Sequence, residues 1–362
     1  MAAQRSITDL GEMVASLPAE ERERFEGIFH VSCSIGRVNP PASMHEFIEG
    51  HFGSLEAVVE QQVVRITNLV TMEGAMFNEL RSQRPMVTEK PEEVDKLIAA
   101  DAGGPFCRPL ESTPEDVFGR IQGRHSVTAS NIAKFDGWSG VVIFDEHNPL
   151  VLSEERVADY IETAMEWARR AHEVDAEAKY PFLLWNCLWR AGASIIHGHA
   201  QVMVARGMHY SKVEHLRRAA LEYGQKVGRN YFDDLYLVHK SLGLALEAKG
   251  IRVLSYLSPI KEKEILLLSE ALSDHLKSCV YEVLDCYVRG LGVRSFNVAI
   301  CMPPLGPTNE DWGGFPVLAR ILDRGDPMNR TVDMAAMELY ASSVVSADPF
   351  GVIQAIEDWL EK

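Results

Sequence analysis

The hydrophobic pattern in the middle of the chain alternates between strand and helix. Short apolar runs, rich in β-branched and aromatic residues, predict strands at 141–144, 180–185 and 202–204. Ser153 is a suitable N-cap, and the residues after it repeat apolar side chains at helical spacing, so a helix is predicted from Ser153 to about Glu173. The apolar stripe of this helix is formed by Val157, Ile161, Ala164, Met165 and Ala168.

The same order of elements recurs later in the chain. An apolar run at 265–268, a helical stripe from Leu272 to Tyr287 and a strand at 296–302 repeat the earlier succession. This recurrence predicts a duplicated unit of strand, helix and strand. Two further helical patterns, 212–228 and 233–249, are predicted to bridge the two copies.

The amino-terminal part has a different pattern. Short amphipathic segments at 20–29 and 43–52, joined by a connection with Pro40 and Pro41, predict a helical extension. From residue 61 the pattern becomes β-type. The predicted division is therefore a helical N-terminal extension at 1–60, a first half at 61–208 and a second half at 209–362.

A polar motif lies between the predicted strands at 180–185 and 202–204. His197, His199 and Gln201 occupy alternate positions, so a strand would direct both imidazoles and the amide toward one point. The opposite face carries only Gly198 and Ala200, which would let another backbone or a ligand come close. Upstream, a glycine turn and a short polar side chain suit a backbone that wraps an anion. A buried histidine pair bonded to carbonyl groups is the alternative interpretation.

Composition restricts the ligands of such a site. With 362 residues, of which 46% are hydrophobic, the chain can build a large core as one domain or two. The 36 basic and 52 acidic side chains give a net charge of −16, which argues against binding to nucleic acid or to an anionic membrane. Phosphate ligands would then be held by local donors.

The cysteines and the amino terminus indicate the compartment. The six cysteines include no close pair, which favours a reducing environment. Residues 1–13 lack the apolar core of a signal peptide, and nowhere do eighteen apolar residues follow one another. A cytoplasmic protein is predicted.

The segment around the histidines resembles the galactose-1-phosphate uridylyltransferase branch of the histidine triad superfamily. The positions that match the family's spacing are Asn186, Gly192, Ser194, His197, His199 and Gln201. The resemblance implies an α+β fold of tandem histidine-triad-like repeats, with a mostly antiparallel sheet flanked by helices. It implies that His199 attacks the α-phosphorus of a nucleotide sugar and that Gln201 holds the phosphoryl oxygens. His197 and Ser194 would complete the catalytic group, with Asn186 beside the substrate.

These residue types suit nucleotidyl transfer. A neutral imidazole is a good nucleophile near pH 7, and the phosphoramidate it forms is reactive enough to pass the nucleotide to a second phosphate. Histidine triad hydrolases carry a third histidine where this chain has Gln201. An amide forms hydrogen bonds but cannot shuttle a proton, which favours transfer over hydrolysis.

Other segments extend the resemblance to the substrate. Arg81, Arg84 and the proline after them match an Arg-x-x-Arg-Pro element that the family uses near phosphates, although such arginines are also common on surfaces. Asn131 matches an asparagine near the nucleotide, and a turn residue is the alternative. Glu338 aligns with the sugar-recognition loop, or it is a helix-surface carboxylate.

A zinc site is implied by the same resemblance. Cys107, His147 and His197 match three of the four ligands of the family, while Gly104 replaces the first cysteine. An incomplete set predicts weakened zinc binding unless water or another group, such as Cys33, completes it. A decayed site held together by packing is the alternative.

The function that the resemblance implies is nucleotidyl transfer. The enzyme would move a nucleoside monophosphate from a nucleotide sugar to a sugar 1-phosphate or to phosphate, and it would work as a possible homodimer. Two alternatives are a dinucleoside polyphosphate phosphorylase or hydrolase of the same superfamily and a catalytically silent nucleotide-binding homologue.

Overall fold

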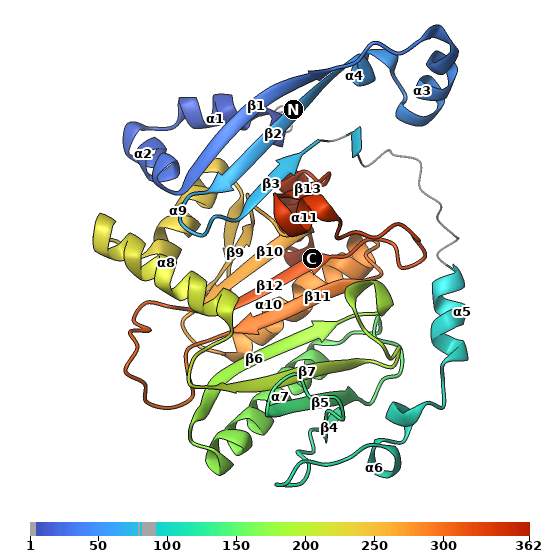
Figure 1. Ribbon diagram of the computed structural model, residues 1–362, viewed down its shortest axis with the longest axis vertical. Helices are drawn as coiled ribbons and strands as arrows, with labels where there is room; N and C mark the ends of the chain where they lie inside the picture. Colours follow the sequence, from blue (N-terminus) through green and yellow to red (C-terminus); the bar gives the residue numbers. More distant parts are fainter. Residues whose placement is uncertain (1–4, 79, 82–91) are drawn as a thin grey trace.

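The protein is built around two sheets (Figure 1). The computed structural model describes residues 5–78, 80–81 and 92–362. Within these residues, a nine-stranded sheet has the order β4-β5-β7-β6-β11-β12-β10-β9-β8, and a four-stranded sheet has the order β1-β2-β3-β13. All pairs of the large sheet are antiparallel, and β13 pairs with β3 in parallel. The α+β class and the mostly antiparallel sheet are thus confirmed.

The large sheet comes from residues 126–323. Its strands are β4 (Ser126–Ser130), β5 (Trp138–Phe144), β6 (Ala178–Asn186), β7 (His199–Arg206), β8 (Ala245–Ala248), β9 (Ile251–Ser255), β10 (Glu262–Ser269), β11 (Phe296–Cys301) and β12 (Val317–Asp323). Two helices, α7 (Glu154–Val174) and α10 (Asp274–Asp285), lie side by side against one face of this sheet. Ser153 caps α7 through its side chain, as its sequence predicts.

The two copies predicted from the sequence meet at the centre of the large sheet. The first copy contributes β5, α7, β6 and β7, and the second contributes β10, α10, β11 and β12 in the same order. Strands β6 and β11 pair with each other, so the seam between the copies lies there. The boundaries at residues 60 and 208 stay a prediction.

The small sheet begins inside the amino-terminal segment. Helices α2 (Ala19–Ile28) and α3 (His45–Phe52) agree with the helical prediction, but β1 (Phe29–Arg37) lies between them. Strand β1 pairs along its whole length with β2 (Glu60–Asn68), and β3 (Gly74–Phe77) and β13 (Ser343–Val345) complete the sheet. Two short helices, α1 (Leu10–Ser16) and α4 (Leu55–Val59), flank this part.

A cluster of charged groups joins the small sheet to the large one. Glu73, in the connection between β2 and β3, accepts a hydrogen bond of 2.7 Å from Arg320 of β12. The same guanidinium donates to Glu264 of β10 at 2.6 Å. Tyr256, which follows β9, donates to Glu73 at 2.7 Å, so Arg320 and Tyr256 of the large sheet region both bind the loop of the small sheet.

The helices beyond the first copy differ in part from the prediction. Helix α8 (Ser211–Val227) agrees with the predicted 212–228 segment, and α9 (Tyr231–Leu242) begins as predicted. The predicted continuation to residue 249 is wrong, because Gly243 ends α9 with a φ of 79° and β8 follows. The chain closes with α11 (Ala336–Tyr340) and α12 (Pro349–Leu360). No helix of the described ranges is long and apolar enough to cross a membrane.

Candidate active site

His199 is the first residue of β7 and carries an open ring nitrogen. It pairs with Ile143 of β5, and both lie on the face of the sheet opposite α7. Its Nδ1 is 2.8 Å from the carbonyl oxygen of His197, and because a carbonyl only accepts, Nδ1 carries the proton. Nε2 therefore has the lone pair. The residue is 6% exposed, yet Nε2 has no partner among the described residues and is not enclosed by protein.

Electrostatics keep this ring neutral. Burial, the largest effect, lowers the pKa of His199 below the ordinary histidine value, although the hydrogen bond to the His197 carbonyl opposes the shift. A neutral ring whose Nε2 lone pair is free is the form that attacks phosphorus.

Gln201 lies two residues further along β7, on the same face as His199. Its cross-strand neighbours are Val141 and Leu184. The Oε1 atom is enclosed and has no hydrogen-bond partner within the described parts of the chain. The Nε2 atom has no partner among the described residues and is not enclosed, so its NH₂ group is the part of this amide that can donate to a substrate oxygen.

His197 does not point where His199 points, which corrects the expectation that both imidazoles share one focus. It precedes β7, and its Nε2 donates to the Phe144 carbonyl at 2.9 Å. Its Nδ1 faces away from His199, toward Cys107 and His147. Between the histidines, a Cβ on Gly198 would lie 2.6 Å from the Phe144 ring, so only glycine fits there.

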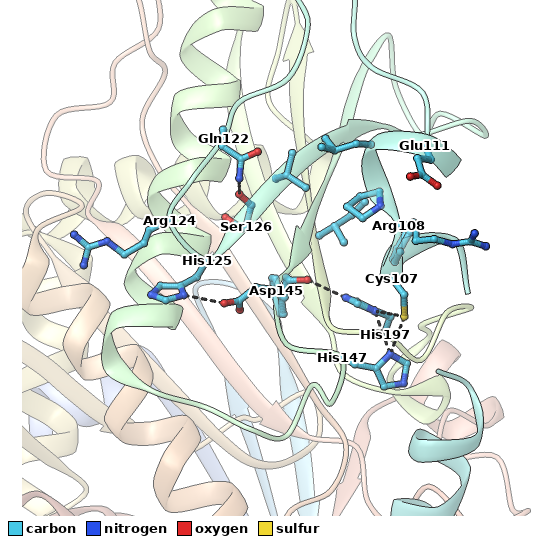
Figure 2. Close-up of a pocket in the computed structure, with 16 residues that line it drawn as sticks. Cys107, Arg108, Glu111, Gln122, Arg124, His125, Ser126, Asp145, His147 and His197 are labelled. Carbon is cyan, nitrogen blue, oxygen red and sulfur yellow. Dashed lines mark hydrogen bonds and ion pairs between the residues drawn. The ribbon is translucent and has the colours of Figure 1, made fainter. Parts of the chain in front are cut away.

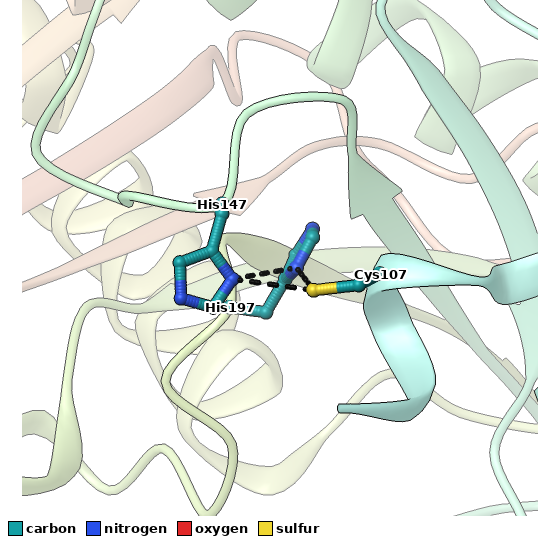
Figure 3. Close-up of side chains that lie close together, drawn as sticks. All are labelled: Cys107, His147 and His197. Carbon is teal, nitrogen blue, oxygen red and sulfur yellow. Dashed lines mark hydrogen bonds between the residues drawn. The ribbon is translucent and has the colours of Figure 1, made fainter. Parts of the chain in front are cut away.

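Three side chains form a candidate metal centre (Figure 3). His147 Nδ1 lies 3.1 Å from His197 Nδ1, and Cys107 Sγ lies 3.5 and 3.4 Å from these two atoms. The Nε2 atoms of both rings donate to carbonyl groups, that of His147 to Ile98 at 2.8 Å. Both Nδ1 atoms therefore present lone pairs to each other. Burial lowers the pKa of His197, which disfavours a proton on its Nδ1.

This geometry fits a tetrahedral metal ion. Zinc bonds of about 2.0 Å to nitrogen and about 2.3 Å to sulfur separate neighbouring ligands by roughly 3.3–3.6 Å, close to the spacing of these atoms. Cys107, His147 and His197 would hold the ion. Bound zinc would have a structural role, because it would link the Cys107 segment to the residues that follow β5 and precede β7. Gly104 lies at the start of the same turn, and Cys33 lies on β1 in the small sheet.

Replacing Cys107 with serine should reduce the metal content of the purified protein. Loss of a thiolate ligand should weaken zinc affinity by more than about tenfold, because changes outside the ligand shell alone cost about 10–100-fold. Zinc per chain, measured by plasma emission spectrometry, reports the result. The matched control is Cys33→Ser, an exposed cysteine. Equal zinc content in the two variants would contradict the metal centre.

The loop before β7 carries the next predicted residues. Asn186 ends β6, and continuation of the β6–β7 register puts it beside His199, about 5 Å away across the strands. Gly192 adopts a φ of 98°, and a Cβ there would lie 3.9 Å from Asn186 Nδ2. Ser194 is exposed in this loop. Asn186 and His199 thus lie on one part of the sheet face, and Ser194 lies in the loop that joins their strands.

An apolar surface lies on the other side of His199. Val127, Ala129, Val141 and Ile143 form a small cluster separate from the main core, and Phe106 packs on it. The Phe106 ring contacts the His199 ring edge to face at 5.2 Å. A cavity of about 480 Å³ adjoins this surface and reaches from the metal centre to the His125–Asp145 pair (Figure 2).

The remaining predicted residues are spread over a wider area. Asn131 follows β4 and bonds to the Ser139 backbone, about 13 Å along the strands from His199 at about 3.3 Å per residue. Arg81 and Glu338 both line a cavity of about 910 Å³ between the two sheets, where Glu338 pairs with Lys261 at 3.6 Å. Arg84 lies outside the described residues.

Two residues near the site were not predicted. Asn297 of β11 donates to Asn186 at 2.6 Å and accepts from Arg324 at 2.7 Å. Arg324 lines the 910 Å³ cavity. The sequence contains no signal for them, because Asn297 is 111 residues from its partner Asn186 and belongs to the copy without paired histidines.

The fold is that of uridylyltransferase-like proteins. An ADP-glucose phosphorylase from Arabidopsis thaliana, with bound ADP-glucose, superposes with a TM-score of 0.60 at 15% identity, over 80% of this chain and 96% of that one. A GalT-like protein from Arabidopsis thaliana gives 0.57 at 15% identity, over 71% and 92%. A uridylyltransferase gives 0.56 at 15% identity, over 82% and 98%.

These likenesses confirm the fold that the histidine motif implies. No protein-family model and no curated protein matches the sequence.

Proposed function

We propose that this protein is a nucleotidyltransferase that moves a nucleoside monophosphate from a nucleotide sugar to a sugar 1-phosphate or to phosphate through a nucleotidyl-His199 intermediate. The observation that carries the proposal is the state of the His199 ring. Nδ1 is committed to the His197 carbonyl at 2.8 Å, which leaves Nε2 unprotonated and open. A ring held only for packing needs no such open nitrogen.

The two chemical steps need no separate base. In the first, His199 Nε2 forms a bond to the α-phosphorus while the bond from that phosphorus to the sugar phosphate breaks. The ring becomes positively charged, and the His197 carbonyl that accepts from Nδ1 stabilises this charge. In the second, a phosphate oxygen of the acceptor attacks the phosphorus, and the bond to Nε2 breaks. Ping-pong kinetics follow from this scheme.

The surfaces around His199 can hold the two ends of such a donor. The apolar cluster and Phe106 provide a flat, partly buried surface for a nucleobase. On the other side, the cavity with Arg81 and Glu338 offers cationic and hydrogen-bonding groups for a sugar phosphate. Zinc at Cys107, His147 and His197 would keep the His197 carbonyl in place beneath His199.

A donor screen tests the proposal. The protein is incubated with UDP-glucose, ADP-glucose or diadenosine tetraphosphate, each labelled at the α-phosphorus, and the protein-bound label is counted after denaturation. Label from a nucleotide sugar, discharged by phosphate or by a sugar 1-phosphate, supports the proposal. Label from diadenosine tetraphosphate alone would indicate a dinucleoside polyphosphate phosphorylase. Binding without label would indicate a silent homologue.

Replacing Gln201 with histidine should increase hydrolysis of the intermediate. A second imidazole on this face can take a proton from water, and general base catalysis contributes about 10²–10⁴-fold, so a rise of tenfold or more in the ratio of hydrolysis to transfer is expected. Free nucleoside monophosphate and transfer product are measured by chromatography. The control is Gln354→His, at an exposed glutamine of α12. An unchanged ratio would contradict the role of the amide.

A further inference from the structure

A chain of three side chains crosses the seam between the two copies beside the candidate active site. Asn186 belongs to β6 of the first copy, and Asn297 of β11 is its direct cross-strand neighbour. Arg324 follows β12 and donates to Asn297 Oδ1 at 2.7 Å. Asn297 Nδ2 in turn donates to Asn186 Oδ1 at 2.6 Å and to the Ala191 carbonyl at 3.0 Å.

Only one assignment of donors and acceptors satisfies these three hydrogen-bonded side chains. A guanidinium donates and never accepts, so Asn297 must turn its oxygen toward Arg324. Its NH₂ group then faces Asn186, where Ala191 provides a second acceptor that also requires a donor. Asn186 must therefore accept this hydrogen bond through its Oδ1 atom. Its own NH₂ group is thereby left toward the loop at Gly192.

Arg324 is well fixed as the first member of the chain. Its Nε and Nη2 atoms donate to Asp333 at 2.7 and 3.1 Å, and both side chains are mostly buried. Burial opposes ionisation of Asp333, but the Arg324 charge outweighs it and holds the pKa of this carboxyl below its usual range. Arg190 donates to the Arg324 carbonyl at 2.9 Å, so the backbone is held as well.

The NH₂ group of Asn186, at the free end of these three linked side chains, belongs to a residue on the same face of the sheet as His199. Asn186 Nδ2 has no partner among the described residues and is not enclosed. Continuation of the β6–β7 register places the Cα atom of Asn186 about 5 Å from that of His199. An NH₂ donor attracts the oxygens of a phosphate, whereas an amide oxygen would repel them. The orientation of the Asn186 amide therefore decides whether the site accepts an anion.

We propose that Asn297 and Arg324 are positioning residues of the second copy, which fix the Asn186 amide so that its NH₂ group binds the phosphoryl oxygens of the donor. The inference rests on the proposed function for the identity of the donor. It assigns a task in the reaction to the half of the fold that has no paired histidines. The ligand group is a phosphoryl group of a pyrophosphate or of a nucleotide sugar.

The test compares Asn297→Asp with Asn297→Ala. Aspartate keeps a partner for Arg324, so the melting temperature should stay at least as high as that of the alanine variant. It cannot donate to Asn186, however, so the Asn186 amide turns its NH₂ group to the new carboxylate and its oxygen to the substrate. Affinity for inorganic pyrophosphate and labelling of His199 by ADP-glucose or UDP-glucose should fall about 10–100-fold, the value of a hydrogen bond to a charged group. Asn297→Ala should lose less affinity and less labelling than Asn297→Asp, because alanine does not pull the NH₂ group of Asn186 away from the substrate.

The matched controls are Asn309→Asp and Asn309→Ala, at an exposed asparagine, which should behave as the wild type. Arg324→Met should weaken pyrophosphate binding in the wild-type background and add little to Asn297→Ala, because both changes release the same amide. A merely structural role predicts losses that follow the melting temperature instead.

The outcomes separate this inference from the proposed function. If the wild type takes label and Asn297→Asp labels as Asn309→Asp does, the positioning role is overturned and the transfer function stands. If no donor labels the wild type but pyrophosphate binds with the expected ranking of variants, the positioning role stands and the transfer function fails. If the wild type neither binds pyrophosphate nor takes label, both are overturned.

Discussion

Replacing His199 with alanine is expected to abolish the nucleotidyl-enzyme and to lower the rate of transfer by at least about 10⁴-fold, as removal of a covalent nucleophile does in enzymes of known mechanism. Nε2 of this ring has a free lone pair and no partner among the described residues, and it is open on the site face. Binding of the donor should change far less, because the surfaces for the base and the sugar phosphate are untouched. Protein-bound label and steady-state transfer are the two measurements.

The control for this experiment is His275→Ala, at an exposed histidine of α10. Both proteins should melt at similar temperatures, since His199 contributes one backbone hydrogen bond and one ring contact. Undiminished label in the His199 variant would mean that another side chain is the nucleophile.

Replacing Arg320 with methionine is expected to destabilise the protein by about 3–5 kcal/mol, because the change leaves two carboxylates without their shared cation. Glu264 has no exposed side-chain surface, and Glu73 is mostly buried. Burial works against the ionised form of Glu73, yet the Arg320 charge keeps its pKa below 4.5. Burial already raises the pKa of Glu264 despite the Arg320 charge, so without Arg320 the pKa of Glu264 would rise further and that of Glu73 would rise as well.

The dependence of this effect on pH has a definite sign. In the wild type, the depressed pKa of Glu73 contributes stability at neutral pH that is lost as the pH falls through its folded value. In the variant, the pKa values of Glu73 and Glu264 are raised in the folded state, so protonation of these carboxyls favours folding as the pH falls. The deficit should therefore shrink between pH 7 and pH 4 in urea unfolding. Arg170→Met, an exposed change on α7, is the control, and a loss as small as that of the control would contradict the account.

Segments with one dominant period were predictable from the sequence. The stripe from Val157 to Ala168 packs against the sheet, as helical spacing requires, and all its members are buried. The alternation at His199 and Gln201 gives two side chains on one face of β7. In both cases the spacing of residues in one segment is enough to predict which side chains share a face.

Strand β1 was not predicted, because its residues do not show such a pattern. Only Phe29 at its start is buried, and from Cys33 to Arg37 the strand is exposed. It is an edge strand whose order comes from pairing with β2, so neither apolar alternation nor β-branched residues are needed to form it. The turn at Gly243 was not predicted for a related reason. The short strand β8 after it has no pattern of its own, so the helical spacing of α9 continues through it in the sequence.

The directions of individual side chains were the least predictable part of the site. Spacing alone puts His197 and His199 on one face, but the backbone before β7 turns His197 toward Cys107. The contacts between Asn186, Asn297 and Arg324 join segments more than a hundred residues apart or separate strands. Such contacts follow from topology and leave no local trace.

The seam between β6 and β11 has a consequence for how this gene can evolve. Duplication ordinarily leaves one copy free to degenerate once the other retains the chemistry. Here the copy without paired histidines pairs with β6 along five residues and binds the loop ahead of β7 through Asn297. Deleting it would leave the interior strand β6 without one of its two neighbours, so a variant that loses the second copy is expected to lose the fold of the first as well.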